Sequence, residues 1–546
     1  MEFSGVTLLF LFFANVLVLG ASSSQDHNDH FLKCLTDEFE SSNADLSNVI
    51  YSPQNASYAS LLRSPFLVRE SSSLKPLLII TPFHKHEIQA VIYCSKKLGT
   101  QIRVRSGGHD YEGLSYTSGI PFVILDMRNF RSVSVNTEEK TAWVEVGATL
   151  GQLYYTIARH SRTLAFPAGV CPTVGVGGHI SGGGHGMIAR KHSVAADHVI
   201  DAKLITADGQ ILDRRSMDED LFWAIREGGT SFGIVLAFKV ELVTVPETVT
   251  VFNVTRTSEQ NLTHLVHKWQ YIADKIDDNL TMRLFITSLR SPIHGNRVIN
   301  CSFTSLYLGR VHDLLPVMRE KLPELGLVEE DCIEMSWIES VLYLAGLTNE
   351  PLNILLSRTG ASVLGKVYFK GKSDFVRQPI PVSGLRGMWR FLHEEDELVA
   401  QLEITPWGGA LNSYSESEIP FTHRAGNIMM IHYGVFWYGA ENSELERHMD
   451  WIRRLYSYMG PYVSKNPRAA FINYRDLDLG MNNKGNTSYT QASVWGRKYF
   501  GNNFDRLVRA KSKIDPSNFF RNEQSIPPLY SSPVTIRPYS EKIVSS

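Results

Sequence analysis

Short apolar runs alternate with amphipathic stretches between residues 75 and 245. Apolar and β-branched runs predict strands at 77–81, 102–105, 122–126, 142–146 and 233–240. Helices are predicted at 87–97 and 149–158. In the second helix Thr149 is a suitable N-cap, and four side chains share one face: Leu150, Leu153, Tyr154 and Ile157. This part of the chain therefore predicts an α+β domain.

The pattern changes after residue 245 to longer strands and amphipathic helices. One helical stripe is expected to face a hydrophobic core: Leu262, Leu265, Val266, Trp269, Ile272 and Ile276. Apolar runs at 282–289, 300–308 and 429–437 predict strands. This second part predicts an antiparallel sheet with helices on one face. From about residue 473 the sequence becomes polar and aromatic again.

The first residues of the chain resemble a targeting segment. An apolar run from Val6 to Gly20 is followed by small residues and a polar stretch. This run is shorter than the roughly 20 residues that a spanning helix needs. We expect residues 1–23 to be a cleaved secretory signal peptide, with a membrane anchor as the alternative, and a destination in the vacuole, the cell wall or outside the cell. Six glycosylation sequons agree with that route: Asn55, Asn253, Asn261, Asn279, Asn300 and Asn486.

Composition and charge narrow the class of protein. The chain has 546 residues, 43% hydrophobic and 20% charged, which excludes a disordered, collagen-like or coiled-coil protein. A net charge of -2 gives no electrostatic reason to bind nucleic acid or an anionic membrane. No metal site is expected, because the close histidine pairs lack a carboxylate at ligand spacing. Five cysteines are too few for a disulfide scaffold, and their odd number leaves at least one thiol for another role.

Three glycine-rich segments stand out in the first domain. The segment at 103–113, RVRSGGHDYEG, follows a predicted strand, and its backbone N–H groups suit a phosphate-bearing ligand. The segment at 166–186, FPAGVCPTVGVGGHISGGGHG, matches neither the Rossmann, the P-loop nor the hydrolase spacing. A third, GGTSFGIV at 228–235, again puts glycines before a strand. Together they suit an elongated, phosphate-bearing cofactor, with a purely structural loop as the alternative for the first segment.

Five longer motifs follow one another along the chain. They are RSGGHD at 105–110, CPTVGVGGHISGGG at 171–184, DLFWAIR at 220–226, NYRDLDLG at 473–480 and NEQSIPP at 522–528. Together they resemble the berberine bridge enzyme-like flavoproteins of plants, over essentially the whole mature chain. The resemblance implies an FAD-binding domain of the vanillyl-alcohol-oxidase (PCMH) type at 24–245, with its core at 75–245. An α+β substrate domain would be inserted at 246–472, and residues 473–546 would return to the FAD domain.

The resemblance also implies how the cofactor is held. His109 and Cys171 match the two residues that bind the flavin covalently, and imidazole and thiolate are nucleophiles that can add to an electrophilic flavin. The other expected FAD contacts are Arg105, Ser106, Gly107, Gly108, Asp110, Val174, Gly175, Gly178, His179, Gly182, Gly183, Gly233, Val235 and Asn473. Cys34 and Cys94 match the family's disulfide. Cys301 and Cys332 are then expected to be free thiols, with an extra pair as the alternative.

The substrate side of the pocket departs from many relatives. Tyr474 matches the family's active-site tyrosine, although a phenol is a poor base at neutral pH unless a cation or the flavin stabilises its phenolate. His185 stands where a tyrosine is usual, and His294 matches a histidine of the cannabinoid-forming branch. Three pocket histidines could act as bases or only shape and hydrogen-bond the substrate. The catalytic candidates are Tyr474, His432, His185 and Tyr111, and the substrate-binding candidates are His294 and Met430.

These residues predict a secreted FAD-dependent oxidase of a plant specialised metabolite, either an aromatic or prenylated phenolic or an alkaloid. A hydride would pass to flavin N5, O2 would accept the electrons, and ring closure could follow. In the family, a small residue at the position of Val174 goes with fast reoxidation by O2. The expected partners are a small molecule and O2, and the expected state is a monomer. The alternatives are a carbohydrate or monolignol-type alcohol oxidase, an FAD-retaining cyclase without net redox, and a pollen-allergen-like or defence protein.

Overall fold

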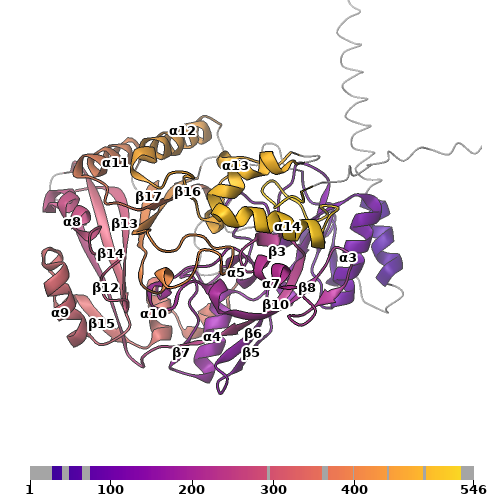
Figure 1. Cartoon of the computed structure of the whole chain (residues 1–546), viewed down its shortest axis with the longest axis horizontal. Coiled ribbons are helices and arrows are strands. Elements are labelled where there is room, and N and C mark those ends of the chain that lie inside the picture. Colours follow the sequence, from indigo (N-terminus) through magenta and orange to yellow (C-terminus); the bar gives the residue numbers. More distant parts are fainter. Residues whose placement is uncertain are drawn as a thin grey trace, which may run out of the picture.

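The computed structural model describes residues 28–39, 48–63, 74–291, 295–359, 367–396, 399–438, 442–483 and 487–529. The expected signal peptide, His294 and the Asn486 sequon lie outside these residues. The described residues form three larger sheets and one two-stranded ribbon (Figure 1). Within the same ranges, no helix combines the length and the apolar character needed to cross a bilayer.

The first sheet has a parallel centre. Its strands lie in the order β1 (Ile50–Tyr51), β2 (Ile79–Ile80), β4 (Phe122–Asp126) and β3 (Gln101–Arg105), and β2, β4 and β3 run parallel. Helix α2 (Tyr58–Leu62) precedes β2, and α3 (Lys85–Leu98) connects β2 to β3. Glu87 caps the start of α3, because its carboxylate accepts the N–H groups of Phe83 and His84. A disulfide joins Cys94 of α3 to Cys34, which lies in the helical residues 28–39.

The second sheet is antiparallel. Its order is β5 (Val133–Asn136), β6 (Thr141–Glu145), β10 (Ile234–Glu241), β8 (Val199–Ile205) and β9 (Ile211–Leu212). Helix α4 (Leu150–His160) begins at Thr149, whose hydroxyl accepts the Gln152 N–H at 3.2 Å, so the predicted cap is confirmed. The other elements of this region are the ribbon of β7 (Leu164–Ala165) with β11 (Val243–Thr244) and the helices α5 (Val176–Ile180), α6 (Ala189–His192) and α7 (Glu219–Ala224).

The third sheet is antiparallel and the largest. Its order is β15 (Cys332–Met335), β12 (Val249–Thr257), β14 (Arg297–Tyr307), β13 (Leu280–Arg290), β17 (Ala400–Pro406), β18 (Met429–Trp437) and β16 (Tyr368–Val376). Its outer face is covered by α8 (Leu262–Trp269), α9 (Val311–Lys321), α11 (Val382–Glu394) and α12 (Asn442–Met459) (Figure 1). Helix α10 (Trp337–Leu344) instead packs on the second region, where Trp337 meets the Tyr154 ring at 5.3 Å.

Helix α8 is shorter than the hydrophobic stripe predicts. It ends at Trp269, and Ile272 and Ile276 follow in turns that still pack on the core of the third sheet. Gln270, the first residue after the helix, is anchored there because its side-chain amide bonds both backbone groups of Ile380. The predicted core stripe is therefore confirmed, whereas its fully helical conformation is wrong.

The last part of the chain returns to the first two sheets. Helices α13 (Tyr489–Phe500) and α14 (Phe504–Ile514) lie beside them (Figure 1). Arg506 of α14 pairs with Asp220 of α7 at 3.0 Å, and its guanidinium lies 4.1 Å from the centre of the Trp223 ring. These contacts bring residues from both ends of the sequence into one hydrophobic core, separate from the core of the third sheet.

Candidate active site

The first two glycine-rich segments cross at very short range. A Cβ on Gly107 would lie 2.3 Å from the backbone nitrogen of Gly175, and a Cβ on Gly175 would lie 2.0 Å from Ser106 Oγ. That hydroxyl donates to the carbonyl of Val146 at 2.5 Å. Gly108 has a φ of 74°, a conformation that glycine adopts readily. The glycines therefore allow the two segments to pack backbone against backbone.

This crossing brings the two candidate flavin nucleophiles to one hydroxyl group. Thr173 Oγ1 lies 3.0 Å from His109 Nε2 and 3.4 Å from Cys171 Sγ. The Cys171 thiol is exposed. Burial lowers the pKa of His109 to about 4, although a hydrogen bond with the Thr173 backbone acts in the opposite direction. His109 is therefore a neutral imidazole at physiological pH, which is its nucleophilic form.

The segment after Thr173 has one open backbone position, at Gly178. Nothing lies within 4 Å of a Cβ placed on Gly178, whereas a Cβ on Gly182 would collide with the Asn473 side chain. Asn473 Nδ2 donates to the carbonyl of His179 at 2.9 Å, and His179 Nε2 accepts the N–H of Gly169 at 3.1 Å. An imidazole and an exposed thiol that meet at one hydroxyl group, in a segment with an open glycine, fit a cofactor that both side chains could bind.

Other expected FAD contacts are engaged with protein groups. Arg105 forms a buried ion pair with Asp126 at 2.6 Å. Asp110 accepts the backbone N–H groups of two neighbouring residues and lies 3.2 Å from Arg475 Nε. Two further candidates lie at the start of β10, packed against β8: Gly233 and Val235. These contacts hold the loops in place, and direct contact of these residues with FAD stays a prediction.

A fully buried carboxyl group stands behind the second glycine-rich segment. Neither oxygen of Glu227 has a hydrogen-bond partner among the described residues, and a Cβ on Gly183 would lie 3.5 Å from Oε1. Burial raises the pKa of Glu227 well above its ordinary value, and the cation of Arg424 opposes this only partly. The Arg424 guanidinium is occupied by Asp197, at 2.6 Å. Glu227 is therefore held as the neutral acid.

Tyr474 and His185 meet although 289 residues separate them in the sequence. Tyr474 ends a short 3-10 helix (Ile472–Tyr474), and its hydroxyl oxygen lies 3.1 Å from His185 Nε2. Burial raises the pKa of Tyr474. The pKa of His185 lies well below its ordinary value, mainly because the ring is buried and also because the Arg283 cation is near. Both groups are therefore neutral near pH 7, and the tyrosine hydroxyl donates to the imidazole when the imidazole hydrogen is on Nδ1.

Other aromatic rings pack against the ring of Tyr474. The Tyr111 ring stacks on the Tyr474 ring at 5.3 Å, and the His432 ring lies 4.4 Å from the same ring. Phe369 of β16 packs edge-on against Tyr111 at 4.7 Å. Burial lowers the pKa of His432 to about 3, and its Nε2 has no hydrogen-bond partner in the described part of the chain. The four catalytic candidates therefore lie in one cluster, in which Tyr474 contacts each of the other three.

Arg283 is a site residue that the sequence analysis missed. It lies on β13 and pairs with Glu403 of β17 inside the protein. Its guanidinium acts on the two pocket tyrosines, because it lowers the pKa of Tyr474 and of Tyr111 against the larger effect of burial. A single arginine in an alternating strand pattern normally faces solvent, so only the polar positions at 283 and 403 on paired strands could have indicated its role.

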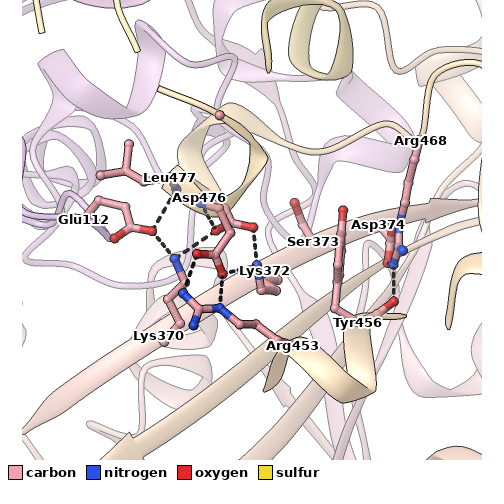
Figure 2. A network of polar contacts seen from close by, with 12 residues as sticks. Glu112, Lys370, Lys372, Ser373, Asp374, Arg453, Tyr456, Arg468, Asp476 and Leu477 are labelled. Carbon is pink, nitrogen blue, oxygen red and sulfur yellow. Dashed lines mark hydrogen bonds and ion pairs between the residues drawn. The ribbon is translucent and has the colours of Figure 1, made fainter. Parts of the chain in front are cut away.

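A buried charge network ties the pocket loops to the third sheet (Figure 2). Lys370 of β16 pairs with Glu112 and with Asp476, the latter at 2.8 Å, and Lys372 pairs with Asp476 at 2.7 Å and with Asp478 at 2.8 Å. Burial opposes the charge on Lys370, but the two carboxylates outweigh it and hold its pKa above the ordinary value. The network balances three cations against three anions: Lys370, Lys372 and Arg453 against Glu112, Asp476 and Asp478.

The network lies directly behind the two pocket tyrosines. Glu112 follows Tyr111 in the chain and accepts the N–H of Leu477 at 3.0 Å. Asp476 comes two residues after Tyr474, and its N–H donates to Tyr499 Oη at 3.0 Å. The lysines therefore fix the backbone that carries both phenols relative to the third sheet.

The remaining predicted residues are spread more widely. Met430 is buried on β18, two residues before His432, and packs in the core of the first two sheets. Val174 is half-buried, and its carbonyl accepts the Leu150 N–H at 2.9 Å. Cys301 and Cys332 are free thiols in the structure. The sequons at 55, 253 and 261 are exposed and those at 279 and 300 are half-buried; no cluster of metal-ligating side chains occurs within the described ranges.

Comparison with known proteins defines the class. A family model described as an FAD binding domain matches residues 76–214, and one described as berberine and berberine like matches residues 470–527. The fold is therefore that of a flavoprotein with an FAD-binding domain of the vanillyl-alcohol-oxidase type and an inserted α+β domain. The predicted fold class is confirmed.

Full-length relatives define the family. The chain is 48% identical to berberine bridge enzyme-like 18 of Arabidopsis thaliana, over 96% of this chain and 97% of the relative. It is 45% identical to tetrahydroberberine oxidase of Berberis wilsoniae, over 97% of this chain and 99% of the relative. The chain belongs to the berberine bridge enzyme-like family and is an FAD-dependent oxidoreductase.

Solved structures agree with this assignment. The structure of berberine bridge enzyme-like 28 of Arabidopsis thaliana matches with a TM-score of 0.84 and 44% identity, over 92% of this chain and 100% of that one. Phl p 4, a grass pollen allergen with glucose dehydrogenase activity, matches with a TM-score of 0.84 and 41% identity, over 91% and 99%. The predicted family is therefore confirmed by sequence and by fold.

Proposed function

We propose that this protein is a secreted oxidase that holds FAD through two covalent bonds, to His109 and Cys171, and oxidises a plant specialised metabolite. The proposed substrate is an aromatic or prenylated phenolic or an alkaloid. A hydride goes to flavin N5 and O2 accepts the electrons, and oxidative ring closure is included among the products. The proposed domain boundaries are 24–245, 246–472 and 473–546, and the proposed state is a monomer.

One observation carries this proposal: His109 Nε2 and Cys171 Sγ both contact Thr173 Oγ1. Imidazole and thiolate are the side chains suited to forming bonds with an electrophilic ring. The thiol also lies close enough to Tyr111 to affect it, because burial first, then Tyr474 and then Cys171 raise the pKa of the Tyr111 hydroxyl group. The two proposed flavin nucleophiles and the two tyrosines are therefore proposed to belong to a single site.

The base is proposed to be Tyr474. Bound FAD supplies a two-electron acceptor for the substrate hydride. With the imidazole hydrogen on Nδ1, His185 Nε2 can take the hydroxyl proton of Tyr474, and the phenolate oxygen that this leaves takes the substrate proton. Arg283 stabilises that phenolate, because a nearby cation favours the anionic form. Burial works against that phenolate, so proton transfer is expected only with the substrate in contact.

The aromatic cluster around Tyr474 supports an aromatic substrate. Tyr111, Phe369 and Phe436 form a chain of ring contacts of 4.7 and 4.9 Å, which suits a flat apolar ligand. His432 Nε2 offers a hydrogen bond to a phenol or an amine. The relative named tetrahydroberberine oxidase supports an alkaloid. A carbohydrate oxidase is the second candidate, supported by the structural neighbour with glucose dehydrogenase activity.

Two measurements test this function. Acid-precipitated wild-type protein should stay yellow, and only the double variant His109→Ala, Cys171→Ala should release all its flavin. Anaerobic mixing with phenolics, alkaloids and sugars should then bleach the flavin absorbance with members of the first two classes. Free FAD from the wild type would refute the double attachment, and bleaching by sugars alone would establish the second candidate. Turnover of a substrate without any bleaching would identify a cyclase.

Transport is part of the same proposal. The sequons at Asn55, Asn253, Asn261, Asn279 and Asn300 are at least partly accessible, which supports glycosylation in the secretory pathway. The proposed destination is the vacuole, the cell wall or the outside of the cell. A lower mass after enzymatic removal of N-glycans, together with an N-terminus near residue 24 in protein purified from the plant, would support it, and an intact, unglycosylated N-terminus would contradict it.

A further inference from the structure

The hydroxyl group of Thr173 contacts both proposed flavin nucleophiles. Its Oγ1 lies 3.0 Å from His109 Nε2 and 3.4 Å from Cys171 Sγ. The hydroxyl is half-buried, between an exposed thiol and an imidazole with a lowered pKa. The hydroxyl oxygen is the only polar atom of a threonine side chain, and its two hydrogen-bond contacts are with the two nucleophiles.

The backbone around Thr173 is held firmly enough to make this hydroxyl a fixed point. The N–H of Gly151 donates to the carbonyl of Pro172 at 2.9 Å, and the N–H of Leu150 donates to the carbonyl of Val174 at 2.9 Å. A Cβ on Gly107 would lie 3.0 Å from the carbonyl oxygen of Thr173. The residue is therefore pinned by helix α4 on one side and by the first glycine-rich segment on the other.

We propose that Thr173 is a positioning residue for cofactor attachment, whose hydroxyl holds the imidazole of His109 and the sulfur of Cys171 in the arrangement that both bonds to the flavin require. This inference rests on the proposed double attachment. It adds a third residue, which forms no bond to the cofactor, to the two that do.

The chemistry of attachment gives the hydroxyl a specific task. Each attachment forms one bond from nitrogen or sulfur to a flavin carbon and removes one hydrogen from that carbon and one from the nucleophile. Two electrons and two protons are therefore released for each bond, and O2 takes them up as hydrogen peroxide. A hydroxyl that donates to sulfur favours the thiolate, and a hydroxyl that contacts the imidazole restrains its rotation.

The test measures how fast each of the two covalent bonds to the flavin forms in full-length secreted protein. Thr173→Val keeps the size of the side chain and removes the hydroxyl, Thr173→Ser keeps the hydroxyl, and Thr173→Ala is a second deletion in case the valine variant does not fold. Thr117→Val is the matched control, because Thr117 lies near the same loop and its hydroxyl bonds only the Gly113 carbonyl. Peptide mapping by mass spectrometry gives the fraction of protein linked at each position during a timed expression.

Loss of the hydroxyl should slow attachment at Cys171, at His109 or at both by about 5- to 10-fold, the factor expected for one hydrogen bond. Thr173→Ser and Thr117→Val should attach flavin at the wild-type rate. The same measurement in Cys171→Ala and in His109→Ala assigns the effect to each bond separately. Wild-type rates in both Thr173→Val and Thr173→Ala would overturn the inference while leaving the double attachment standing. Wild-type protein that releases all its flavin in acid would overturn both.

Discussion

Lys372→Met removes one cation from the buried network behind the pocket. The Lys372 side chain is 2% exposed and pairs with two carboxylates, Asp476 at 2.7 Å and Asp478 at 2.8 Å. Removing one partner of a buried ion pair costs about 3–5 kcal/mol, because the remaining charge loses its compensation without returning to water. Asp476 keeps Lys370 and Asp478 keeps Arg453. We therefore expect the lower end of this range, a loss of about 3 kcal/mol in the free energy of unfolding.

Urea unfolding followed by tryptophan fluorescence measures this loss as a shift of the midpoint. Lys321→Met is the control, because Lys321 lies on the surface, pairs only with Glu320 and should leave the midpoint unchanged. A second variant, Lys372→Met with Asp478→Asn, restores the balance of charge and should recover about 1 kcal/mol relative to the additive sum. Two results would refute the argument that an uncompensated carboxylate in this network destabilises the folded protein: a loss below about 1 kcal/mol for Lys372→Met, or strict additivity in the double variant.

Three further predictions concern the pocket and its surroundings. Tyr474→Phe should lower the rate of flavin reduction by roughly 10²-fold while flavin loading stays intact; an unchanged rate would move the base to His432 or His185. Val174→Leu should slow reoxidation of the reduced flavin by O2 in stopped-flow mixing, and wild-type enzyme that reoxidises no faster than free reduced flavin would contradict an oxidase. Glu227 has a raised pKa in the folded state, so its stabilising effect is complete below its ordinary pKa of 4.5 and is lost as the pH rises toward the folded value. The melting temperature of Glu227→Gln relative to that of the wild type should therefore rise between pH 5 and pH 8. A constant difference between the two melting temperatures over this range would disprove the raised pKa of Glu227.

Hydrophobic periodicity predicted most of the strands and helices that carry the site. The strands at 122–126 and 429–437 have the bounds that the pattern gave, because uninterrupted apolar runs have few alternatives to a buried strand. Strand β16 was not predicted at all. Its centre reads KGKSD, which is typical of a polar turn, and its lysines are buried because carboxylates from two distant segments, at 112 and at 476–478, neutralise them.

The candidate site was predictable only as a set of residues. The motifs identified Tyr474 and His185, but no spacing rule connects two side chains that lie 289 residues apart. The importance of Arg283 and Thr173 depends on what lies within 4 Å of them, which neither periodicity nor composition reports. Sequence patterns identify side chains suited to a reaction, and tertiary contacts decide which of them work together.

The distance in sequence between His185 and Tyr474 also has a consequence for the folding of the protein during its synthesis. A ribosome adds about 5–20 residues per second, so these 289 residues take about 15 to 60 s to appear. During this interval the glycine-rich segments and His185 have already left the ribosome, while the segment that closes the pocket does not yet exist. The nascent chain must therefore wait in an unfinished state in which His185, buried in the folded protein, still lacks Tyr474. Chaperones that shield a partly folded domain are expected to matter more for this protein than for one whose active site is encoded within a single contiguous stretch.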